Sequence, residues 1–126
     1  MISTAKEFFQ IYNETFDSGD MEAFSKLFNE PFLSVRPDGS VESLTTNDMA
    51  RDFFTKVLAL WHNEGYKYFA TKDYDVTPIG NKSMLVTLTW ELLNENRDLI
   101  REWRQSYNLL DRNGEWKVIT STFHGA

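Results

Sequence analysis

The segment from Trp103 to His124 decides the fold. Its first part reads Trp103-Arg104-Gln105-Ser106-Tyr107-Asn108-Leu109-Leu110, and its last part reads Glu115-Trp116-Lys117-Val118-Ile119-Thr120-Ser121-Thr122-Phe123-His124. Both parts are strand-like, and Asp111-Arg112-Asn113-Gly114 separates them. Asn-Gly between two such runs is the strongest short-range signal for a β-hairpin. We therefore predict an antiparallel ribbon here, with the rest of the chain covering one of its faces.

The composition describes an acidic, aromatic-rich chain. It has 126 residues, of which 41% are hydrophobic and 15% aromatic, and its formal net charge is −6. This length suits a single domain, 1–126, whose core must be filled largely by rings. An acidic surface repels phosphate backbones and anionic lipids, so we expect neither nucleic acid nor membrane as a partner.

Three features that the sequence lacks limit its chemistry and its cellular location. There is no cysteine, which excludes disulfides, a thiolate nucleophile and thiolate metal sites. The longest unbroken apolar run, Val57 to Trp61, is too short to cross a bilayer. The first residues lack the pattern of a signal peptide. We expect a cytoplasmic protein.

Three helices are predicted before the long strands. Thr4 to Glu7 fits a capping box, and the apolar residues that follow recur at helical spacing. Gly19 can cap that helix and Asp20 can begin a short second one, which we expect Pro31 to end. A second capping box, Thr45 to Asp48, predicts a third helix that runs to about Asn63.

The remaining segments read as strands. They are Phe32 to Arg36, Val41 to Leu44, Tyr66 to Thr77 and Lys82 to Leu93, followed by a turn over Asn94 to Asp98 and then the ribbon. This order predicts an α+β fold with the helices gathered on one face of a curved antiparallel sheet. Because like charges avoid each other across strands, we expect Glu91 to face Arg101 or Arg104 rather than Glu102.

The ribbon leaves open which of its faces points inward. Simple alternation places Trp103, Gln105, Tyr107 and Leu109 on a face with Trp116, Val118, Thr120, Thr122 and His124. The other face carries Leu110, Ile119 and Phe123 and is still apolar, which favours cover by a second copy in a homodimer. A β-bulge in either strand would swap the faces, and alternation alone does not locate one.

The chain resembles the nuclear-transport-factor-2-like superfamily, which includes ketosteroid isomerase and the SnoaL-type polyketide cyclases. The resemblance rests on Tyr12 with Ser18-Gly19-Asp20 and Leu27-Phe28, on the third helix, and on Trp103 to Tyr107 with Gly114 to Val118. It covers essentially the whole chain and implies one SnoaL-like domain, a cone-shaped α+β barrel whose curved sheet wraps around three helices. These are fold signatures, and the superfamily hosts enzymes, binding proteins and oligomerisation modules alike.

The isomerase chemistry of that superfamily is only partly matched. It requires a tyrosine and a protonated aspartic acid as oxyanion donors, and an aspartate base. By resemblance Tyr12 stands at the tyrosine position, Arg36 at the base position and Ser106 at the second donor position. Arginine cannot take a proton, so the chain is unlike an isomerase.

We predict a mostly aromatic pocket with a few polar groups. Its candidate ligand-binding residues are Tyr12, Arg36, Trp61, Trp90, Arg104, Ser106 and His124. The plainer alternatives are a core tyrosine, surface ion pairs such as Arg104 with Glu91, and a partly exposed terminal histidine. With two histidines far apart and no cysteine, we expect no metal site and no cofactor.

Three functions remain open. The first is binding of a small apolar ligand with one anionic or carbonyl end, without established catalysis. The second is a SnoaL-like or isomerase-like acid–base enzyme on a cyclic, polyketide-like substrate, which needs a carboxylate or imidazole in the pocket beside Tyr12. The third is a dimerisation module, which needs no cavity at all.

Overall fold

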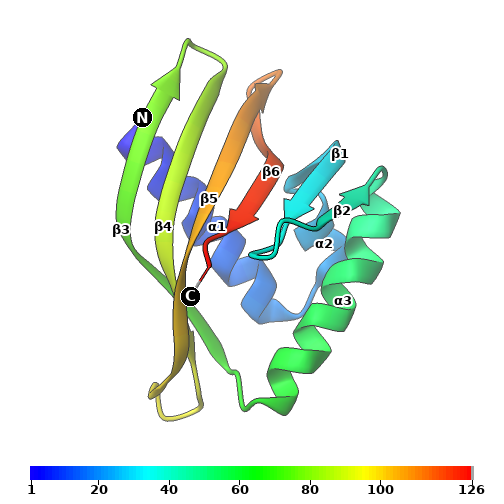
Figure 1. Cartoon of the computed structure of the whole chain (residues 1–126), viewed down its shortest axis with the longest axis vertical. Helices are drawn as coiled ribbons and strands as arrows, with labels where there is room; N and C mark the ends of the chain where they lie inside the picture. Colours follow the sequence, from blue (N-terminus) through cyan, green and yellow to red (C-terminus); the bar gives the residue numbers. More distant parts are fainter. Residues whose placement is uncertain (126) are drawn as a thin grey trace.

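The computed structural model describes residues 1–125, which form three helices and a six-stranded sheet. The elements are α1 (Ile2–Ser18), α2 (Met21–Ser25), β1 (Phe28–Val35), β2 (Val41–Leu44), α3 (Asn47–Asn63), β3 (Tyr68–Ile79), β4 (Ser83–Leu93), β5 (Leu99–Arg112) and β6 (Glu115–Phe123). The sheet order is β2-β1-β6-β5-β4-β3. Figure 1 shows a curved, unclosed sheet with α1 behind the long strands and α3 beside β1 and β2. The predicted α+β architecture is confirmed.

The strand pairing differs from the prediction in one place. β1 and β6 run parallel, whereas the other neighbours are antiparallel. The sheet is therefore mixed, because the last strand of the ribbon lies beside β1 and runs in the same direction.

None of the helices among residues 1–125 is long and apolar enough to cross a membrane.

The first helix begins earlier than its capping box indicated. The structure starts α1 at Ile2, where Met1 is the N-cap without a side-chain cap bond and the Ala5 amide donates to the Met1 carbonyl over 2.9 Å. A cap contributes only about 1 kcal/mol, so it does not stop a helix from extending by a turn. At the other end Gly19 has φ 80° and Asp20 caps α2 by accepting from the Ala23 amide, as predicted.

The second helix is shorter than predicted and does not end at Pro31. It stops at Ser25, and Phe28 belongs to β1, where it pairs with Val118 of β6. Phe24 and Phe28 are both buried. Their spacing of four residues fits one continuous helix, but it also fits a helix that ends before a strand begins. Pro31 lies inside β1, where the β1–β6 register shifts between Phe28 and Leu33 and no ladder donor is required.

The remaining boundaries follow the prediction closely. The N-cap of α3 is Thr46, one residue after the predicted start, and its hydroxyl accepts from the Met49 amide. β3 begins at Tyr68 rather than Tyr66 and continues through Pro78 to Ile79, two residues past its predicted end at Thr77. Proline is tolerated there because β3 is the edge strand of the sheet.

A β-bulge at Ile119 decides which face of the ribbon points inward. Asn108 pairs with Thr120, but the next residue, Leu109, pairs with Val118, so Ile119 has no partner on β5. The faces of β6 therefore change at Ile119. On one side of the bulge Val118 points inward. On the other side Ser121 and Phe123 point inward, opposite Tyr107 and Gln105, in place of Thr120, Thr122 and His124, which simple alternation puts on the face of Tyr107.

The expected separation of Glu91 from Glu102 is wrong. The two residues lie directly opposite each other on β4 and β5. Lys72 on β3 resolves the conflict, because its ammonium lies 3.3 Å from a carboxylate oxygen of Glu91 and 3.3 Å from one of Glu102. The expectation that like charges avoid each other considered only two paired strands. It fails here because Lys72 on a third strand, β3, supplies a positive charge to both carboxylates.

Candidate functional site

A cavity of about 230 Å³ lies between α3 and the concave face of the sheet. Most of its wall is aromatic, and the rings come from α1, α2, α3 and strands β3 to β6. The aromatic lining residues are Tyr12, Phe16, Phe24, Phe53, Phe54, Trp61, Phe69, Trp90, Trp103, Tyr107 and Phe123. Such a wall suits a flat apolar ligand, since rings pack edge to face or offset against one another.

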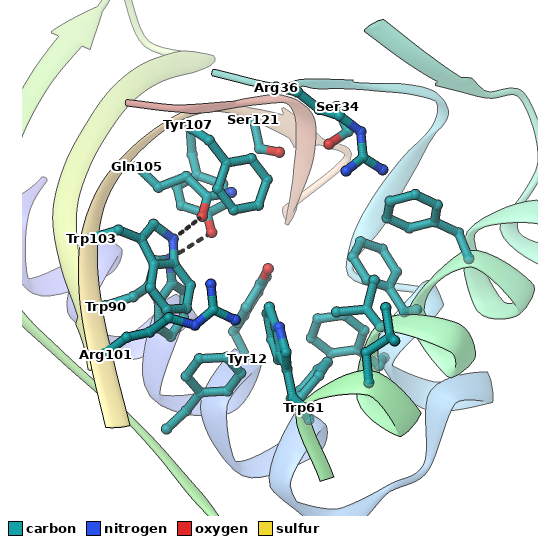
Figure 2. A pocket seen from close by; sticks show the side chains of 18 residues that line it. Tyr12, Ser34, Arg36, Trp61, Trp90, Arg101, Trp103, Gln105, Tyr107 and Ser121 are labelled. Atoms are coloured by element: carbon teal, nitrogen blue, oxygen red, sulfur yellow. Dashed lines mark hydrogen bonds between the residues drawn. The ribbon is translucent and has the colours of Figure 1, made fainter. Parts of the chain in front are cut away.

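Tyr12 reaches the cavity from α1. Its ring packs against Phe24 and Trp90, with centroids 4.7 and 5.3 Å away. Figure 2 shows its hydroxyl pointing into the cavity. Burial raises the pKa of Tyr12 far above its usual value. The phenol therefore stays protonated and serves as a hydrogen-bond donor rather than as a base.

Trp90 and Tyr107 form the floor. The Trp90 Nε1–H donates to the Tyr107 hydroxyl over 2.8 Å, and both side chains are buried. Burial is also the main cause that raises the pKa of Tyr107. The two residues come from adjacent strands, so the sheet itself fixes this part of the wall.

Trp61, Trp103 and Arg101 form a more exposed side of the cavity. The two indole rings are 5.8 Å apart, and the Arg101 guanidinium lies 6.0 Å from the Trp61 ring and 5.2 Å from the Trp103 ring. The Arg101 Nη2 also donates to a carboxylate oxygen of Glu64 at 3.1 Å. Arg101 thus connects β5 to the end of α3 across this side.

The opposite side of the cavity is polar. Ser34 on β1 and Ser121 on β6 are register partners, and both are buried. Gln105 on β5, the register partner of Phe123, is also buried, and its Oε1 accepts from Trp103 Nε1 at 3.0 Å. An indole can only donate, so this bond fixes the amide and leaves its NH₂ group to donate elsewhere. Arg36, just past β1, completes this polar wall.

The charge of the lining is one-sided. Arg36 and Arg101 line the cavity, and no aspartate, glutamate or histidine does so among the described residues. Residues 1–125 also contain no group of three or more histidine, aspartate or glutamate side chains arranged to hold a metal ion. Both charged side chains of the lining are therefore cations that donate hydrogen bonds.

Four of the seven candidate residues line this cavity, namely Tyr12, Arg36, Trp61 and Trp90. The other three lie on the outer face of the sheet. Arg104 donates through Nη1 to the Asp73 carbonyl (2.9 Å) and the Thr89 hydroxyl (3.1 Å). Ser106 bonds to the Thr87 hydroxyl at 2.6 Å and to His124 Nε2 at 2.8 Å.

Several lining residues were not among the sequence candidates. Arg101, Trp103, Gln105 and Tyr107 stand at alternate positions of β5, and this alternation was the available signal. Ser34 and Ser121 carried no such signal. They are far apart in the sequence, and only the pairing of the parallel strands β1 and β6 brings them together.

The comparisons with known proteins agree with this architecture. A family model described as "NTF2-like protein (DUF6841)" matches residues 3–126, so the chain belongs to this family of NTF2-like proteins. No curated protein matches the chain.

Solved structures share the fold at low identity. An NTF2-like protein with a cystatin-like fold from Novosphingobium aromaticivorans is 14% identical, over 94% of this chain and 77% of that one, with a TM-score of 0.75. A putative calcium/calmodulin dependent protein kinase II association domain from Xanthomonas campestris is 14% identical, over 98% of this chain and 86% of that one, with a TM-score of 0.71. Aln2 from a Streptomyces species is 9% identical, over 95% of this chain and 86% of that one, with a TM-score of 0.78.

Proposed function

We propose that this protein binds a small molecule with an apolar, ring-containing body and one anionic or carbonyl end. The observation that carries this proposal is the composition of the cavity wall. Rings supply most of the surface, the only charged side chains described there are Arg36 and Arg101, and no carboxylate lines the cavity. Such a wall rejects cations and favours a ligand whose polar end accepts hydrogen bonds.

The size of the cavity limits the ligand. Its volume of about 230 Å³ is below the ~300–1,000 Å³ of pockets that hold drug-sized ligands. We therefore expect a body of one or two rings, smaller than the cyclic substrates that resemblance to polyketide cyclases suggests.

The composition of the wall favours binding over acid–base catalysis. An isomerase-like enzyme requires a base near the oxyanion donor, and the phenol aimed into the cavity, Tyr12, is held protonated by burial. Arg36 stands at the position where the resemblance placed the base, and it donates only. The third position of that mapping, Ser106, lies outside the cavity.

A homodimer through the outer face of the sheet is a separate proposal. Leu33 on β1 and Leu85 on β4 are 37% and 44% exposed. The Xanthomonas structure is described as an association domain, which is consistent with assembly through this fold. Phe123, however, points into the cavity rather than outward, so less apolar surface needs cover than the sequence indicated. Sedimentation that shows only monomer at micromolar concentration would remove this proposal.

The binding proposal is tested by filling the cavity. Native mass spectrometry of the purified protein checks for a retained ligand, and calorimetric titration with 2-naphthoate measures binding directly. Val57→Trp puts a large ring into the cavity from α3, while Leu85→Trp puts the same ring on the outer face as a control. We expect the first variant to bind at least about tenfold more weakly, and the second to bind like the unmodified protein.

Circular dichroism confirms that both variants fold. Equal affinity of the folded Val57→Trp variant and the unmodified protein would contradict binding in this cavity. The absence of both a retained adduct and naphthoate binding would contradict the proposed function itself.

A further inference from the structure

We propose that Arg36, Ser34 and Ser121 form a carboxylate-binding site at one side of the cavity, and that the ligand is an aromatic or otherwise planar monocarboxylate. This inference rests on the proposed function and adds the class of ligand and the residues that hold its charged end. The composition of the wall does not say whether Arg36 or Arg101 holds the charged end of the ligand. The contacts of the two side chains favour Arg36.

Ser34 and Ser121 are buried residues whose hydroxyls make no hydrogen bond with the described chain. Ser34 is 3% exposed and Ser121 is 4% exposed, and both side chains line the cavity. Neither hydroxyl makes a hydrogen bond within residues 1–125, and neither is a fully enclosed polar atom without a partner, so both open onto the cavity and can donate to a ligand there. Because the strands β1 and β6 hold them in register, the hydroxyls lie at fixed positions on one wall.

Arg36 is the unpaired cation of this site. Its guanidinium lies 5.8 Å from the centre of the Phe53 ring, and no acidic side chain of residues 1–125 lies within 4.0 Å of it. The acid two residues later, Asp38, directs its carboxylate to the Ser40 amide at 2.9 Å and the Ser40 hydroxyl at 2.7 Å. The charge of Arg36 therefore remains available to a ligand.

The backbone holds Arg36 in place at the end of β1. Its amide donates to the Ser40 carbonyl at 2.9 Å, and its carbonyl accepts from the Gly39 amide at 2.9 Å. Gly39 takes φ 86°, a conformation that favours glycine, and so closes a tight turn. Because Arg36 lies two residues after Ser34, both side chains project to the same face. Figure 2 shows them on the same side of the cavity.

Arg101 is a poorer candidate for the charged end. It is already paired with Glu64 at 3.1 Å and lies over the rings of Trp61 and Trp103. Figure 2 places it on the opposite side of the cavity from Arg36. A ligand anion there would compete with an existing ion pair. Arg101 instead holds the two indole rings that would enclose the body of the ligand.

The chemistry of this wall fits a carboxylate better than a more highly charged group. One guanidinium presents a planar fork that matches the two oxygens of a carboxylate. The hydroxyls of Ser34 and Ser121, and the free amide NH₂ of Gln105, can donate to the remaining lone pairs. A phosphate monoester carries close to two negative charges and would require a second unpaired cation, which this wall does not supply.

The test compares an anionic probe with its neutral analogue. The probes are 2-naphthoate and 2-naphthamide, which share the two-ring body and differ in charge. Calorimetric titration is carried out on the unmodified protein, on Arg36→Met and on Arg101→Met as the matched control. Ser34→Ala with Ser121→Ala tests the hydroxyls. Arg36 is exposed, so its replacement leaves the core intact, and circular dichroism verifies the fold of each variant.

We expect the unmodified protein to bind naphthoate about 10- to 100-fold more tightly than naphthamide, as charge-assisted hydrogen bonds imply. Arg36→Met removes this preference because it weakens naphthoate binding much more than naphthamide binding, whereas Arg36→Lys restores part of it. Arg101→Met keeps the preference. The double serine variant reduces it.

Three results overturn the inference. Equal binding of both probes to the unmodified protein, or a preference that survives Arg36→Met and disappears in Arg101→Met, rejects the carboxylate site but leaves the binding cavity standing. No binding of either probe rejects the inference, and together with the absence of a retained adduct it rejects the proposed function as well.

Discussion

The indole Nε1–H of Trp90 donates a hydrogen bond to the Tyr107 hydroxyl over 2.8 Å in the floor of the cavity. Trp90 is 2% exposed and Tyr107 is 2% exposed, so water cannot replace either partner. The bond joins β4 to β5 in the buried centre of the molecule. It explains how a wall made largely of rings keeps one arrangement, because a polar bond of fixed direction orients two of them.

Removing the acceptor should destabilise the protein. Tyr107→Phe leaves the buried Trp90 N–H without a partner, which costs about 1–3 kcal/mol in the free energy of unfolding. Tyr74→Phe is the control, because the Tyr74 hydroxyl bonds to Thr71 in a half-buried position where water can substitute. Denaturant unfolding of both variants measures the difference. Equal losses in the two variants would contradict the importance of the buried bond.

Lys72 should stabilise the sheet by separating two carboxylates. Lys72→Met leaves Glu91 opposite Glu102 without the bridging ammonium, and we expect a small loss of stability that is largest at low salt, because these groups are exposed to solvent. Adding Glu102→Gln to Lys72→Met should recover most of the loss, because the like-charge pair is then gone. Unfolding experiments at low and high salt check this. A single variant as stable as the unmodified protein at low salt would contradict it.

Asp17 should make stability depend on pH. Burial raises the pKa of its carboxyl group, and hydrogen bonds from the Tyr66 hydroxyl and the Phe69 amide offset this only in part. A raised pKa in the folded state means that the contribution of Asp17 is fully present below the ordinary value near 3.8. That contribution is lost as the pH rises through the folded-state pKa.

The variant Asp17→Asn tests this direction, since its amide oxygen can accept the same two bonds at every pH. We expect Asp17→Asn to gain stability relative to the unmodified protein as the pH rises from about 3.5 to 7. The gain should be at most about 1 kcal/mol, because Asp17 is partly exposed. Chemical unfolding across this range measures it. A relative loss for the variant with rising pH would indicate that the carboxylate is favoured in the folded state.

The outer-face residues should not affect ligand binding. Ser106 and His124 hydrogen-bond to each other away from the cavity. We expect Ser106→Ala and His124→Ala to bind naphthoate within about twofold of the unmodified protein, since neither contacts the cavity wall. Calorimetric titration checks this. A tenfold loss in either variant would show that the face assignment fixed by the Ile119 bulge is wrong.

Much of the fold could be predicted from local signals in the sequence. The helical spacing of Ala5, Phe9 and Phe16 marks the buried side of α1, and Gly19 marks its end. Asn113-Gly114 marks the turn of the ribbon, with φ 58° at Asn113 and 91° at Gly114. Each signal acts within a few residues, so it survives without knowledge of the rest of the molecule.

The candidate site could be predicted only in part, because its residues meet through distant pairings. Trp61 and Trp90 could be predicted as aromatic residues of a helix and a strand, and the resemblance pointed to Tyr12 and Arg36. Ser121 and Phe123 were missed because alternation of residues carries no mark of the bulge at Ile119. The placement of Phe28 failed for a related reason, since its spacing from Phe24 fits a helix and only the pairing with Val118 selects a strand.

The most direct test of ligand binding in the cavity uses the four tryptophans of the chain. Trp61, Trp90 and Trp103 line the cavity and Trp116 does not. Titration of ¹⁵N-labelled protein with 2-naphthoate, followed through the four indole N–H resonances, locates the ligand without any variant. We predict shifts at Trp61, Trp90 and Trp103 with Trp116 unchanged. A shift at Trp116 alone, or unchanged resonances at saturating probe, would contradict binding in this cavity.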